Sequence, residues 1–118
     1  MSWKPSTYLA GTPTLPASVE VASTATTIAG PFDVVGGTYA EVALTNTDGS
    51  QTLNAWVESS PDGTTWNAKL NWQGLDAIAA GELRYEGFDC TYERHVRIRG
   101  TASGAGLTST IFMAIYTR

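Results

Sequence analysis

The sequence is poor in the residue types from which catalytic and metal sites are usually built. Its 118 residues include one histidine, His95, and one cysteine, Cys90. A single cysteine excludes an intrachain disulfide and is compatible with synthesis in a reducing cytoplasm. One histidine and one cysteine cannot supply the ligands of an ordinary zinc site. We therefore expect no metal and no cofactor.

Charged residues and long apolar runs are also scarce. Only 15% of the residues are charged, the net charge is −4, and the isoelectric point is about 4.7. An acidic chain is poorly suited to a phosphate backbone, so we expect no nucleic-acid partner. No apolar run approaches the roughly 18 residues of a membrane span. The first residues also lack the apolar core of a secretory signal, so we expect no membrane partner.

Helical periodicity is absent as well, and what remains is typical of strands and turns. Threonine, alanine, glycine and serine are abundant, and apolar residues alternate with polar ones over short stretches. About seven to nine such stretches predict an all-β antiparallel sandwich, either immunoglobulin-like or jelly-roll. The alternation places these residues in the core: Val42, Leu44, Leu53, Val57, Trp66, Val96, Ile98, Ile111 and Met113.

The first 17 residues differ from the rest of the chain. Three prolines within residues 1–17 disfavour a central strand. The segment nevertheless carries apolar side chains, which a disordered tail would lack. We predict an extended N-terminal arm, residues 1–17, followed by one β-sandwich domain, residues 18–118. The arm either lies on another subunit through Trp3, Tyr8, Leu9 and Leu15, or folds over its own core.

The segment Ser59–Trp66, SSPDGTTW, contains the clearest motif. A calcium loop needs several carboxylates, whereas Asp62 stands alone. The pattern is similar to the Asp-box of sialidases, but it occurs once and its glycine comes one place early. A hairpin corner explains the residues directly, because Pro61 presets φ, Asp62 bonds the backbone ahead, and Gly63 takes a positive φ. We predict a corner, with Trp66 entering the core.

We find no candidate for catalysis in the sequence. His95 is the only histidine and shares a strand face with Arg97 and Arg99. Cys90 has no separate Cys/His set and is expected to be a small buried residue. The glycine-rich stretch 100–106 lacks a lysine and a following helix, so it is predicted to be a hairpin loop. The expected function is therefore not enzymatic.

Two sets of side chains are candidates for binding a partner. Arg97 and Arg99 point to one strand face and suit bidentate contacts with carboxylates at an interface. Alternatively, this face is solvated and balanced by a neighbouring acid, with Glu58, Glu82, Glu86 and Glu93 as the candidates. For a carbohydrate, Trp72 is the best exposed ring, together with Tyr85 or Tyr92.

The proline-bearing arm, the Thr/Ala/Gly-rich sandwich and the segment Ala55–Trp66 together resemble small structural proteins of tailed bacteriophage particles. The class of closest resemblance is the capsid decoration, or cement, proteins. The resemblance implies a non-enzymatic virion protein on the capsid surface, made in the bacterial cytoplasm. It would bind the major capsid protein or another virion protein as a symmetric homo-oligomer, with a trimer favoured. The alternative function is a carbohydrate-binding module of a phage tail or a secreted enzyme.

Overall fold

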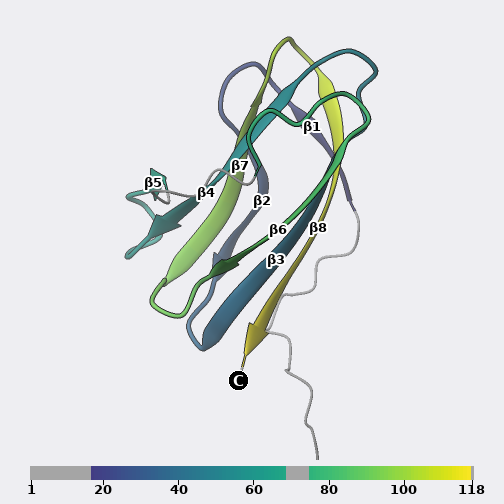
Figure 1. Ribbon diagram of the computed structural model, residues 1–118. Helices are drawn as coiled ribbons and strands as arrows, with labels where there is room; N and C mark the ends of the chain where they lie inside the picture. Colours follow the sequence, from purple (N-terminus) through teal and green to yellow (C-terminus); the bar gives the residue numbers. More distant parts are fainter. Residues whose placement is uncertain (1–16, 69–74, 118) are drawn as a thin grey trace, which may run out of the picture.

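The computed structural model describes residues 17–68 and 75–117, which form two stacked four-stranded sheets (Figure 1). All strand pairs within each sheet are antiparallel. The first sheet has the order β1-β8-β3-β6 and the second sheet β2-β7-β4-β5. The strands are β1 (Ala17–Val21), β2 (Thr26–Asp33), β3 (Gly37–Asn46), β4 (Leu53–Ser60), β5 (Asn67–Ala68), β6 (Leu83–Asp89), β7 (His95–Ala102) and β8 (Leu107–Thr117).

The predicted all-β sandwich is confirmed, and the strand order selects the jelly-roll among the two predicted forms. Successive strands pass from one sheet to the other, except for β4 and β5, which are neighbours in the second sheet. This arrangement of two four-stranded sheets is the jelly-roll topology. An immunoglobulin-like sandwich would divide its strands differently between the sheets.

The core lies between the sheets and is built from alternate residues of the long strands. All the predicted core residues are buried except Trp66, which is only half-buried. The prediction for Trp66 is wrong because its ring contacts Arg97, whose side chain points away from the core. Sequence alternation also missed Leu75 and Ile78, which are fully buried although they lie outside the main strands.

The apolar character of the last strand follows from the sheet topology. β8 lies between β1 and β3 and is therefore an interior strand of the first sheet. Met113 and Ile115 face the core, and Ala114, on the opposite face, is also buried. Both faces of this part of β8 thus carry apolar residues, as is typical of interior strands.

The predicted hairpin loop at residues 100–106 has a different structure. Gly100 lies within β7, and the loop after Ala102 joins β7 to β8 in the opposite sheet, so it is not a hairpin loop. Gly49 does not adopt a positive φ. The turn at residues 46–49 is instead held by Asp48, whose carboxylate accepts hydrogen bonds from the backbone N–H groups of Ser50 and Gln51. Within the described ranges the chain has no helix that could cross a membrane.

Candidate functional site

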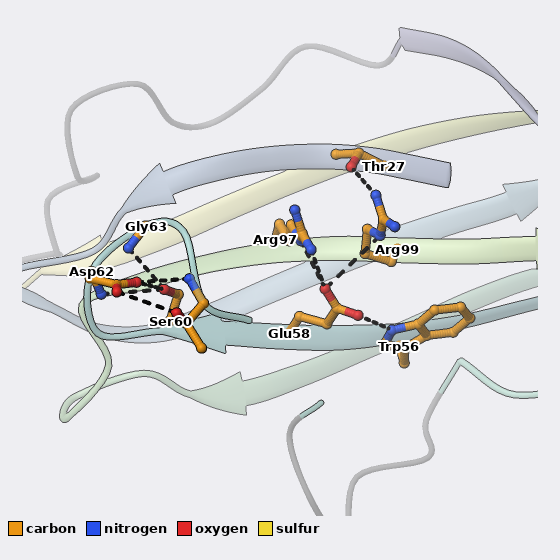
Figure 2. A network of polar contacts seen from close by, with 9 residues as sticks. Thr27, Trp56, Glu58, Ser60, Asp62, Gly63, Arg97 and Arg99 are labelled. Atoms are coloured by element: carbon orange, nitrogen blue, oxygen red, sulfur yellow. Dashed lines mark hydrogen bonds and ion pairs between the residues drawn. The ribbon is translucent and has the colours of Figure 1, made fainter. Parts of the chain in front are cut away.

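The outer face of the second sheet carries a cluster of charged and aromatic side chains (Figure 2). The pairing of β4 with β7 places Trp56 opposite Arg99, and Glu58 opposite Arg97. These positions alternate with the core residues Val57 and Ile98, so their side chains point outward. We call Trp56, Glu58, Trp66, Arg97 and Arg99 the Glu58 cluster.

Glu58 is the centre of this cluster. Its Oε1 accepts a hydrogen bond from Arg97 Nε at 2.8 Å and lies 2.7 Å from Arg97 Nη2. Its Oε2 accepts a hydrogen bond from Trp56 Nε1 at 2.8 Å. Burial raises the pKa of Glu58. The hydrogen bonds from Trp56 and Arg97 and the charges of Arg97 and Arg99 lower it by more, so the net shift of the pKa is downward.

The second arginine is held less completely. Arg99 Nη1 donates a hydrogen bond to Thr27 Oγ1 on β2 at 2.9 Å. Its Nε lies 3.9 Å from Glu58 Oε1, beyond hydrogen-bond distance, and this buried atom has no hydrogen-bond partner. The cluster therefore joins β2, β7 and β4 and leaves one arginine donor without an acceptor.

Arg97 also contacts an aromatic ring. Its guanidinium carbon lies 4.1 Å from the centroid of the Trp66 ring, within the range of a cation–π interaction. The sequence left open whether a neighbouring acid balances the charges of Arg97 and Arg99, and Glu58 is such an acid. A contact of Arg97 and Arg99 with a partner stays a prediction.

The predicted corner at residues 59–66 is a hairpin between β4 and β5, with Glu58 opposite Ala68 and Ser59 opposite Asn67. Ser60 Oγ accepts a hydrogen bond from Gly63 N at 2.8 Å and donates one to Asp62 Oδ1 at 3.0 Å. Asp62 Oδ1 also accepts bonds from the N–H groups of Thr64 and Thr65 at 2.9 and 2.8 Å. These bonds hold the pKa of Asp62 well below its usual range. Gly63 has φ +80°, as predicted.

Other candidates from the sequence lie apart from the Glu58 cluster. Tyr85 is exposed on β6 of the first sheet, whereas Tyr92 is exposed in the turn before β7. Cys90 is fully buried, as predicted. The remaining candidates fall outside the described residues: Trp3, Tyr8, Leu9, Leu15 and Trp72.

The carboxylates with lowered pKa values act as hydrogen-bond acceptors for their own loops and strands. Besides Glu58 and Asp62, they include Asp48, held by the N–H groups of Ser50 and Gln51, and Glu82. A lowered pKa keeps a carboxylate ionised, which suits an anchor and opposes the role of general acid near neutral pH. Among residues 17–68 and 75–117, no group of three or more His, Cys, Asp and Glu side chains could hold a metal ion.

Sequence reasoning listed Glu58 among four candidate acids without choosing between them, and it missed the hydrogen bond that Trp56 donates to Glu58. The alternation in residues 52–58 already placed Trp56 opposite the core side of its strand. This alternation carried no information on which strand lies beside β4, because β4 and β7 are separated by more than 30 residues. The sequence therefore indicated the outward direction of Trp56, but it did not indicate the pairing of β4 with β7.

Comparison with known proteins shows a shared fold. No protein-family model matches the sequence, and a search of the curated proteins finds no match. Among solved structures, a chain from Bacillus endospore appendages, which are described as a family of disulfide-linked pili, matches with a TM-score of 0.55. The match covers 98% of each chain at 18% sequence identity. At this identity the likeness shows the fold alone.

Proposed function

We propose that this protein is a non-enzymatic structural subunit that works in several copies within a larger particle. The observation that carries the proposal is the end-to-end likeness to a chain of a pilus, which is an assembly of repeated subunits. The carboxylates with lowered pKa values support such a role. They accept hydrogen bonds from the chain's own loops and strands and do not converge on one site.

The assembly would differ from disulfide-linked pili in how its subunits are joined. Linking subunits successively by disulfides requires at least two cysteines per subunit, and these 118 residues contain one. Cys90 is moreover fully buried. Contacts between subunits of this chain are therefore expected to be noncovalent.

The first sheet offers a surface for such contacts. Tyr39 on β3 and Leu83 and Tyr85 on β6 are large apolar side chains that are 45%, 58% and 60% exposed. Their register places them on the outer face, since they alternate with the buried Ala40, with Arg84 and with Phe88. Aromatic and leucine side chains gathered on one face are typical of protein interfaces.

In its finer form, the proposal places the protein on a phage capsid as a decoration protein, with a trimer favoured. The resemblance of residues 55–66 and of the arm to phage structural proteins motivates this location. The arm residues Trp3, Tyr8, Leu9 and Leu15 would bind a neighbouring subunit, and each buried aromatic anchor would contribute about 1.5–3 kcal/mol. Repeated copies on a symmetric shell would let a modest single affinity suffice.

Self-association tests the coarser proposal, and shell binding tests the finer one. Multi-angle light scattering over a range of protein concentrations should show a defined oligomer, and electron microscopy should show a regular particle. Purified capsid shells that lack decoration should retain the protein after sedimentation. A monomer at every concentration that binds no shell would contradict both forms. An oligomer that does not bind capsid shells would contradict only the proposed location on the capsid.

A further inference from the structure

A hollow of about 340 Å³ lies where the β4–β5 hairpin meets the turn that leads into β7. It takes no part in the Glu58 cluster. The hairpin lines it from one side, and the turn lines it from the other. The lining residues are Ser59, Ser60, Pro61, Asn67, Tyr92, Glu93 and Arg94.

Both walls of the hollow are held by hydrogen bonds of the chain itself. The hairpin wall is fixed by Ser60 and Asp62 through the bonds described above. In the other wall, Cys90 N donates to Thr38 O at 3.0 Å, and Val34 N donates to Arg94 O at 2.9 Å. The turn is thus tied to the body of the sandwich at both ends. A preformed hollow loses little conformational freedom when it binds a ligand.

Tyr92 is displayed at the rim of this hollow. Its exposed fraction is 98%, the highest of the large apolar side chains in the described part of the chain. The ring does not contribute to the core, because it is almost entirely in water. A turn with fixed ends that presents an aromatic ring beside a polar hollow is suited to contact with a ligand.

The chemistry of the lining narrows the class of ligand. The hollow combines one exposed ring with hydroxyl, amide, guanidinium and carboxylate groups. Glu93 and Arg94 carry opposite charges, so the lining does not select strongly for an anion or a cation. An apolar ligand would displace water from the Asn67 amide and the Arg94 guanidinium without replacing the lost hydrogen bonds. A ligand with an apolar ring face and several hydroxyl groups on its edge meets both requirements, and this is the chemistry of a carbohydrate.

We propose that this hollow is a carbohydrate-binding site. The Tyr92 ring stacks on the face of a sugar ring, and Asn67 and Arg94 bond its hydroxyl groups. The volume suits one or two sugar rings. The proposed site uses neither Trp72 nor Tyr85, and none of its lining residues belongs to the exposed first-sheet surface of Tyr39, Leu83 and Tyr85.

Nuclear magnetic resonance of the full-length, ¹⁵N-labelled protein tests this proposal. The probes are glucose, galactose, N-acetylglucosamine and N-acetylneuraminic acid, added singly, and a glycan array extends the search to oligosaccharides. We expect at least one probe to shift the signals of residues 59–61, 67 and 92–94. The Tyr92→Ala variant should weaken that binding by about tenfold, the effect of losing a good aromatic contact. An exposed side chain can be removed without unfolding the protein, so the loss reports on binding.

Tyr85→Ala is the matched control, because it removes an exposed tyrosine from the first sheet. It should leave carbohydrate binding unchanged. The proposal is overturned if no probe and no array glycan binds, if the shifts fall elsewhere, or if Tyr92→Ala binds as well as the natural chain. Light scattering of Tyr92→Ala separates this result from the proposed assembly, which the substitution should leave intact.

Discussion

Arg97 lies against Trp66, with 4.1 Å between its guanidinium carbon and the centroid of the ring. Arg97 belongs to β7, and Trp66 belongs to the hairpin that follows β4. Their contact therefore joins the corner to the neighbouring strand. The same guanidinium pairs with Glu58, and one planar group thus makes both contacts. A lysine cannot reproduce this combination, because its ammonium has no planar fork.

We therefore predict that Arg97→Lys destabilises the protein by about 1–2 kcal/mol, through loss of the forked ion pair and of the stacking contact. Urea unfolding, followed by tryptophan fluorescence, measures the change. Arg94→Lys, at an exposed position in the turn before β7, is the matched control and should change the stability by less than about 0.5 kcal/mol. Equal effects of the two substitutions would show that the contacts of Arg97 contribute nothing.

The stability should fall in acid because several carboxylates have lowered pKa values in the folded protein. Hydrogen bonds from the N–H groups of Thr65 and Thr64 lower the pKa of Asp62, and similar bonds lower that of Asp48. A group of this kind stabilises the fold above its unfolded pKa of about 4 and loses that contribution as the pH falls toward its folded pKa. We expect the unfolding free energy to decrease steadily below about pH 4.

The contribution of Asp62 can be isolated with Asp62→Asn. This variant should be less stable than the natural chain at pH 7, because the ionised acceptor of four hydrogen bonds is lost. The two proteins should converge in stability as the pH falls well below about 4, where the carboxylate of the natural chain becomes protonated. A difference between the curves that does not depend on pH would contradict this account.

Asn46 is a buried polar side chain that joins two loops. Its Nδ2 donates to Gln51 O at 2.8 Å and to Ile78 O at 3.0 Å, while its Oδ1 accepts a bond from Asp48 N. Asn46→Ala removes all three of these bonds, although Ile78 O keeps its bond from Leu53 N. The loss should cost about 2–3 kcal/mol in chemical unfolding. The exposed Asn54, which accepts one bond from Ala77 N, provides the comparison. If Asn54→Ala costs as much, burial of the Asn46 bonds is not the cause.

Gly100 lies in β7 between β2 and β4, where there is no room for a side chain. A Cβ at this position would come within 2.7 Å of Ile28 Cδ1 and within 2.9 Å of the backbone oxygen of Asn54. Gly100→Ala should therefore destabilise the protein by about 1–3 kcal/mol. Gly49→Ala is the control, because a Cβ there meets nothing within 4 Å and φ is not positive. It should be neutral or slightly stabilising, and thermal unfolding of both variants measures the contrast.

The arm can be tested by deleting residues 2–16. We expect the truncated chain to keep its sandwich, because the described core lies entirely within residues 17–117. It should no longer assemble with itself or bind capsid shells. Circular dichroism monitors the fold, and light scattering and co-sedimentation with shells monitor assembly. A truncated chain that decorates shells as tightly as the full-length protein would show that the arm packs only on its own core.

Local patterns in the sequence determined the class of fold and the corner. Alternation with a period of two assigns each residue of a strand to one face, so Val96 and Ile98 could be placed in the core and Arg97 and Arg99 outside it. The corner depends on Pro61, Asp62 and Gly63, which are neighbours in the chain. Such features need no information about distant segments.

Only the tertiary structure decided which strands lie together. The pairing of β4 with β7 brings Glu58 to Arg97, 39 residues further along the chain. The position of Trp66 on the outer face follows from that pairing, because Arg97, whose side chain points away from the core, offers the ring a cation–π contact. The carbohydrate hollow likewise joins residues 59–67 with residues 92–94. Strand pairing depends on the packing of the whole sandwich, so alternation within one strand could not reveal these contacts.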